Sequence, residues 1–176
     1  MINTNFNPFP ALKTGNFRLR QLTLEDDNEI FTLRSNDQVL EYLGRPPAKD
    51  LTEARKFIKK INKAIIGGES IYWVISSQSV NKLIGTICLW NIDKQENKAE
   101  IGFELLPEYM GKGIMQEVIP VVIEFGFSKM NLDSIEGEVE PNNIKSIKLM
   151  EKFGFIFNRK LDVTIVYNLT KDKYQN

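Results

Sequence analysis

The pattern of hydrophobic and polar positions changes its period along the chain. Residues 17–22 alternate between the two kinds and predict a first strand, whereas residues 52–66 place apolar side chains at helical spacing. Residues 70–77, 83–92 and 98–106 then form three strand-length runs that are separated by short polar turns. This spacing predicts an antiparallel meander in the middle of the chain.

The second half of the chain alternates between helices and strands. Helical spacing covers residues 114–129 and 143–152, and strands are predicted at residues 134–139, 155–160 and 163–169. Such alternation is typical of one mixed sheet covered by helices. We therefore expect an α/β (α+β mixed) fold with a central, mostly antiparallel sheet and about four flanking helices.

Length and composition predict a soluble globular protein. The chain has 176 residues, of which 42% are hydrophobic and 26% charged. This size suffices to bury a core without disulfides or metals, so we expect a single domain over residues 1–176. The formal net charge is zero, which argues against a nucleic-acid partner because affinity for phosphate backbones depends on basic charge.

Cysteine and histidine usage narrows the chemistry further. Cys88 is the only cysteine and histidine is absent. The single thiol excludes an intrachain disulfide and fits a reducing compartment, so we expect a cytoplasmic protein. The absence of histidine excludes histidine triads and histidine metal ligands, and no metal is expected. Residues 1–17 lack a secretory signal pattern and no apolar run approaches a membrane span, so no membrane partner is expected.

A glycine-bearing turn within residues 104–115 carries the clearest chemical signal. A strand-like run ends at Pro107, Gly111 and Gly113 follow, and a helix opens directly after them. Backbone N–H groups at a helix N-terminus bind anions, and glycines let a diphosphate approach the main chain. The spacing is neither a Rossmann fingerprint, because residue 116 is Gln, nor a P-loop. Taken alone, the glycine pair fits an ordinary tight turn as well as a phosphate site.

Several motifs in a fixed order give this turn a context. They are AEIGFEL at 99–105, YMGKGIMQE at 109–117, FGF at 125–127, PNNIKS at 141–146 and EKFGF at 151–155. This series resembles the GNAT superfamily of acetyl-CoA-dependent N-acetyltransferases. More narrowly, together with TGNFRLR at 14–20, it resembles the RimJ/RimL-type branch named for ribosomal-protein N-terminal acetylation. The resemblance covers roughly residues 12–169, nearly the whole chain.

The resemblance implies that the turn binds the diphosphate of acetyl-CoA through main-chain N–H groups. The family motif Q/R-x-x-G-x-G/A maps onto Met110, Gly111, Lys112, Gly113, Ile114 and Met115. Met110 and Met115 depart from the motif, but backbone recognition tolerates both. In the family a splayed strand pair bonds the pantetheine amides, which implies backbone roles for Leu105 and Leu106. Asn143 maps to an asparagine that contacts the CoA arm.

Acetyl transfer from a thioester requires a neutral amine, a polarised carbonyl and a stabilised thiolate. Glu104 and Glu100 have the same parity on one strand, so both point to one sheet face and are candidate bases. Glu104 is preferred because we expect it nearer the splay; either residue also fits a surface carboxylate paired with lysine. The family's tyrosine acid maps to Met150, which cannot donate, so the resemblance supports Ser146 as the hydrogen-bond donor to the sulfur. Asn143 and Ser146 are also types that begin helices, and both roles can hold.

The resulting hypothesis is an N-acetyltransferase that moves acetyl from acetyl-CoA directly to a primary amine. The acceptor is a protein N-terminal α-amine or a small-molecule amine, and the protein is a monomer or homodimer. Tyr42 and Arg45 lie in the link expected to select this amine; Arg45 fits either a carboxylate-binding or a solvated side chain. An acetyl-CoA sensor and a non-catalytic interaction domain of the same fold remain the alternatives.

Overall fold

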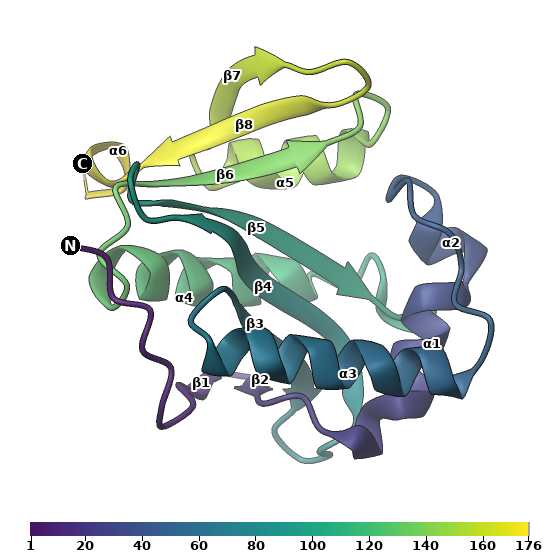
Figure 1. Ribbon diagram of the computed structural model, residues 1–176. Helices are drawn as coiled ribbons and strands as arrows, with labels where there is room; N and C mark the ends of the chain where they lie inside the picture. The colour runs from purple at the N-terminus through teal and green to yellow at the C-terminus, as the bar shows by residue number, and fades with distance from the viewer. Residues whose placement is uncertain (176) are drawn as a thin grey trace.

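The computed structural model describes residues 1–175, whose strands form one eight-stranded sheet in the order β1-β2-β3-β4-β5-β6-β8-β7 (Figure 1). The strands are β1 (Leu12–Lys13), β2 (Phe17–Arg20), β3 (Ile71–Ser77), β4 (Leu83–Asp93), β5 (Lys98–Leu105), β6 (Ser134–Val139), β7 (Ile156–Lys160) and β8 (Ile165–Thr170). Only β5 and β6 pair in parallel; the other neighbours are antiparallel. The predicted mixed, mostly antiparallel sheet and its β3-β4-β5 meander are confirmed.

Six α-helices in the described chain exceed the expected four. They are α1 (Asp27–Ser35), α2 (Asp37–Leu40), α3 (Leu51–Ile66), α4 (Ile114–Ser128), α5 (Ile144–Lys152) and α6 (Lys171–Gln175), with 3-10 turns η1 (Leu24–Asp26) and η2 (Pro107–Tyr109). Both α2 and α6 are too short to produce a periodic signal. Asn36 separates α1 from α2, because its side chain accepts the N–H groups of Gln38 and Val39 at 3.0 and 3.3 Å.

Helices cover both faces of the sheet. In Figure 1, α3 lies in front of β3 and β4, and α4 lies behind them. Trp73 of β3 packs edge-to-face on Phe125 of α4, with ring centroids 5.2 Å apart. The alternate side chains of β3 to β5 therefore face α1 and α3, where the site described below is formed. None of the helices in the described chain is long and apolar enough to cross a bilayer.

β5 and β6 pair over a short stretch and then diverge. Their register joins Lys98 to Ser134, Ala99 to Ile135 and Glu100 to Glu136. Beyond these pairs the two strands continue without bonding each other, and Figure 1 shows them separating. The splay implied by the resemblance is confirmed. It begins directly after Glu100, however, so the expectation that Glu104 lies nearer to it is wrong.

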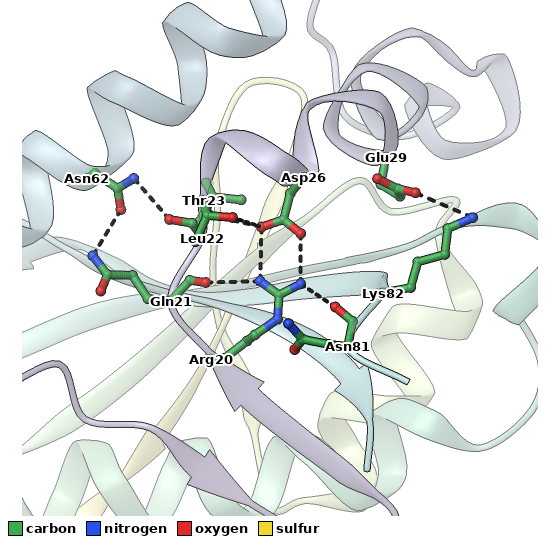
Figure 2. Close-up of polar contacts among 9 residues, drawn as sticks. All are labelled: Arg20, Gln21, Leu22, Thr23, Asp26, Glu29, Asn62, Asn81 and Lys82. Atoms are coloured by element: carbon green, nitrogen blue, oxygen red, sulfur yellow. Dashed lines mark hydrogen bonds and ion pairs between the residues drawn. The ribbon is translucent and has the colours of Figure 1, made fainter. Parts of the chain in front are cut away.

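Arg20 ties the N-terminal strand β2 to the first helical turn. Its guanidinium donates to both carboxylate oxygens of Asp26, at 2.9 and 2.7 Å, and to the carbonyls of Gln21 and Asn81 at 3.0 and 2.7 Å (Figure 2). Asp26 also accepts the N–H of Thr23 at 2.9 Å. Asp26 is buried, so this pair is shielded from water and holds the end of β2 against η1.

Replacing Asp26 should destabilise the fold. We expect Asp26→Ala to lower the free energy of unfolding by about 3 kcal/mol, because Arg20 would keep a shielded charge without its partner. The measurement is urea unfolding followed by circular dichroism. Glu29→Ala is the control: Glu29 pairs with the exposed Lys82 at 3.4 Å, and its loss should cost below about 1 kcal/mol. Equal losses in the two variants would contradict this account of Arg20.

Candidate active site

Two glycines in left-handed conformation lead from η2 into α4. Gly111 has φ 72° and Gly113, the N-cap of α4, has φ 76°. A Cβ at either position would meet no other atom. Backbone conformation, rather than crowding, therefore requires glycine at both positions, and the space beside them is open.

Most N–H groups of this turn have no acceptor in residues 1–175. The N–H of Met110 donates to the Pro107 carbonyl at 3.2 Å, so it is not available as predicted. The N–H groups without an internal acceptor are those of Gly111, Lys112, Gly113, Ile114 and Met115. Unpaired N–H groups at a helix N-terminus carry partial positive charge and bind anions. The geometry of an anion site is therefore present at the predicted place.

The first turn of α4 is held from two sides. The Glu117 carboxylate accepts the Thr14 hydroxyl and, at 2.7 and 2.9 Å, the backbone and side-chain N–H groups of Asn16. These hydrogen bonds, from Asn16 first and Thr14 second, lower the pKa of Glu117. On the other side, Lys152 of α5 donates to the Gln116 side chain at 2.5 Å. The TGN segment at 14–16 thus positions the glycine turn.

The edge of β5 that faces the splay is set by its pairing with β4. The Leu106 N–H donates to the Ile84 carbonyl at 3.0 Å, and the Leu106 carbonyl accepts from Tyr109 at 2.9 Å. The expected backbone role of Leu106 is therefore corrected, since both groups are already bonded. Bonding direction alternates along an antiparallel strand, so Leu105 and Phe103 direct their N–H and C=O groups away from β4, toward the gap.

A cavity of about 700 Å³ lies beside the splay. Its lining brings together six of the residues named from the sequence: Glu100, Glu104, Asn143, Ser146, Tyr42 and Arg45. The glycine turn does not line it. A separate cavity of about 640 Å³, between the N-terminal segment and α4, contains none of the predicted residues. The predicted catalytic side chains therefore share one cavity, and the glycine turn lies outside it.

Glu104 is engaged by an arginine of its own chain. Arg45 Nη1 lies 2.5 Å from Glu104 Oε1 and Nη2 lies 3.1 Å from Oε2, while Nη2 also donates to the Leu33 carbonyl at 3.1 Å. Of the two predicted forms of Arg45, the carboxylate-binding one is observed, with Glu104 of the same chain as the carboxylate. This bidentate pair fixes the Glu104 carboxylate and occupies both of its oxygens.

Glu100 has a different environment on the same face of β5. Burial raises the pKa of Glu100 to about 7, against a hydrogen bond from Asn91 at 3.5 Å that lowers it, and nearby Glu138 and Glu136 raise it further. A carboxylate with a pKa near neutrality is suited to general-base work. Glu100 therefore lies where the splay begins and has a pKa suited to a general base.

The start of α5 contributes Asn143 and Ser146. Asn143 Oδ1 accepts the Ser146 N–H at 3.2 Å, so the predicted helix-start role of Asn143 is confirmed. The Ser146 hydroxyl has no partner in the described chain and is half-buried in the cavity wall. Met150, one turn later, is 4% exposed and packs against Gly137. The hydroxyl is thus a free donor on this helix.

Sequence reasoning missed several other lining residues. Arg34 and Tyr72 reach the cavity from elements distant in sequence, and no local signal marked them. Glu138 also lines the cavity. It has the same parity on β6 as Glu136, the register partner of Glu100, and therefore lies on the same face of the sheet. Burial raises the pKa of the Cys88 thiol to about 12, so this thiol is protonated at neutral pH. No group of three or more potential metal-binding side chains is found in residues 1–175.

Comparisons with known proteins agree with this architecture. The family model for the acetyltransferase (GNAT) domain matches residues 16–156. An uncharacterised N-acetyltransferase of Bacillus subtilis (strain 168), YoaA, is 35% identical over 147 residues, which are 84% of this chain and 83% of YoaA. A Vibrio cholerae spermidine N-acetyltransferase, solved with CoA and spermine, has a TM-score of 0.80 and 25% identity, covering 91% of this chain and 98% of its own.

Similarity to ribosomal-protein acetyltransferases is confined to the fold. The structure of a ribosomal-protein-S5-alanine acetyltransferase from Vibrio fischeri matches with a TM-score of 0.78 and 21% identity, covering 94% of this chain and 98% of that one. The family model, by contrast, spans most of the chain. The chain belongs to the GNAT acetyltransferase domain family, and it is an acyltransferase.

Proposed function

We propose that this enzyme transfers acetyl from acetyl-CoA directly to a primary amine bound in the 700 Å³ cavity. The observation that carries the proposal is the run of free N–H groups from Gly111 to Met115 at the start of α4. They lie next to the splayed strand β5. The cavity opens beside that splay and is lined by Glu100, whose pKa is raised to about 7. The proposed sites for the diphosphate, for the pantetheine arm and for the amine therefore follow one another, from the glycine turn through the splay to the cavity.

The residues of this chain fit acetyl-CoA. The N–H groups of Gly111 to Met115 would hold the diphosphate, and the open space beside both glycines admits it. The backbone groups of Leu105 and Phe103 would bond the pantetheine arm as an additional strand. The Asn143 side chain keeps its amide N–H groups for the same arm, since only its oxygen caps α5. Acetyl-CoA supplies an activated thioester.

Glu100 is proposed as the base for the incoming ammonium group. Deprotonating an alkylamine of pKa ~10.4 near neutral pH costs about 4 kcal/mol, whereas an α-amine of pKa ~7.8 costs below about 1 kcal/mol. A carboxylate with a pKa near 7 accepts this proton directly or through one water. Glu104, preferred on sequence grounds, is proposed instead to position the cavity wall through Arg45.

Ser146 is proposed to donate a hydrogen bond to the leaving sulfur. Ser146→Ala should lower kcat about 10-fold and leave the Kd of acetyl-CoA within about twofold, because the bond strengthens as charge develops on sulfur. Stopped assays of thiol release and calorimetry measure the two quantities. Lys145→Ala, at an exposed neighbour, is the matched control. Equal losses in turnover and binding for the serine variant would remove this role.

The proposed function is tested by thiol release from acetyl-CoA against a panel of amines. The panel contains an α-amino peptide, a polyamine and small monoamines, and calorimetry measures acetyl-CoA binding in parallel. Turnover with at least one amine supports the enzyme. Tight acetyl-CoA binding without turnover on any amine would favour the sensor, and no binding would favour an interaction domain.

A further inference from the structure

Arg34 brings a positive charge into the cavity without a carboxylate partner. Its guanidinium carbon lies 3.9 Å from the ring centroid of Phe57, so the side chain of this α1 residue is fixed against α3. Its guanidinium has no hydrogen bond or ion pair within residues 1–175. Arginines in such half-buried places normally bind a carboxylate or carbonyl. The ring contact therefore holds Arg34 while its donors stay free.

The surrounding charges leave this end of the cavity positive. Arg45 already binds both oxygens of Glu104, so this carboxylate is not available to Arg34. Burial first, and Arg45 second, lower the pKa of Arg34. In addition, Arg45 Nε is buried without a partner, and Lys60 of α3 lines the same cavity. These features are typical of a site that receives an anion.

The opposite end of the cavity is acidic. Glu100 of β5 and Glu138 of β6 line it, and Glu138 lies close enough to Glu100 to raise its pKa. Glu100 and Glu104 are four residues apart on β5, which separates the two ends by about 13 Å. The cavity thus carries opposite charges at its two ends.

We propose that the acceptor is a primary amine that also carries a carboxylate or phosphate group, bound by Arg34. The inference rests on the proposed function, in which the amine lies at Glu100. A dipolar acceptor complements both ends, whereas a polyamine would place a further cation beside Arg34. The planar guanidinium fork binds carboxylate and phosphate in the same bidentate manner.

Matched amine pairs test the inference. Lysine is compared with cadaverine, O-phosphoethanolamine with ethanolamine, and spermidine serves as the polyamine. Calorimetry measures binding to the free and the CoA-loaded protein, and thiol release measures kcat/KM. The anionic member of at least one pair should be preferred about 10-fold or more, and whether lysine or O-phosphoethanolamine gains more distinguishes carboxylate from phosphate.

Variants assign this preference to Arg34. Arg34→Gln should reduce the ratio within each pair to about twofold or less and leave kcat/KM for the member without an anionic group unchanged, while Arg34→Lys should retain part of the preference. Arg18→Gln, at an exposed β2 residue, should keep the full ratio. Thermal unfolding verifies that each variant is folded.

The outcomes separate the inference from the proposed function. Arg34-dependent binding of the anionic amines without any turnover would support the anion site and overturn the transferase proposal. Preference for spermidine, or an anionic preference that survives Arg34→Gln, would overturn the anion site while the transferase proposal stands. Failure of every anionic amine to bind the free or CoA-loaded protein would also overturn it.

Discussion

Gly113→Val should weaken acetyl-CoA binding by about 100-fold or more. Gly113 caps α4 with φ 76°, and a β-branched residue would be forced out of this conformation. The N–H groups from Gly111 to Met115 would then no longer converge. Each hydrogen bond to a charged group contributes about 1.5–3 kcal/mol, so loss of two accounts for the effect. Calorimetric titration with acetyl-CoA measures it.

Gly44→Val separates this effect from backbone strain. Gly44 also has a left-handed φ, 57°, and a Cβ there would meet no other atom. Both variants should therefore lose about 1–2 kcal/mol of stability, but only Gly113→Val should lose acetyl-CoA binding. Similar losses of binding in the two variants would show that strain, and not the cradle, is responsible.

Glu100→Gln should lower kcat/KM by about 10²- to 10⁴-fold for an alkylamine acceptor, the range typical of general bases. Because the base must be ionised and burial raises the pKa of Glu100 to about 7, wild-type kcat/KM should rise with pH through about 7. This limb should be absent in the variant. An acceptor with a pKa above about 9 keeps the amine's own titration outside the window.

The stability of the Glu100 variant supplies a control with a defined sign. The pKa of Glu100 is raised from its ordinary value of 4.5 to about 7 in the folded state, so this group lowers stability as pH rises from about 4.5 to 7, and the loss is complete above 7. Glu100→Gln should therefore unfold no more easily than wild type at pH 8. Glu96→Gln, at an exposed residue of the same hairpin, should leave activity unchanged. Retention of the pH limb in Glu100→Gln would exclude Glu100 as the base.

The sheet and its order of elements were largely predictable because their signals are local. Strand-length runs bounded by polar turns marked β3, β4 and β5, and the helical stripe from Ile114 marked α4. The glycine turn was also a local signal, since left-handed backbone favours glycine. These features depend on residues adjacent in the chain, which sequence patterns record directly.

The choice between the two glutamates was not predictable, because it depends on long-range contacts. The parity rule placed Glu100 and Glu104 on one face correctly. The end of the β5–β6 pairing and the Arg45 contact then distinguished them, and neither feature leaves a mark in the local pattern. Arg34 is similar: its ring contact joins α1 to α3, and only the folded structure reveals that its donors are free.

The central claim is that the start of α4 holds a diphosphate with its own backbone N–H groups. Amide NMR spectra of the 15N-labelled protein during titration with CoA test it most directly. We predict saturable shifts that are largest at the five amides without internal acceptors, Gly111, Lys112, Gly113, Ile114 and Met115. Shifts that leave these five amides unchanged while others saturate would place CoA elsewhere and contradict the account.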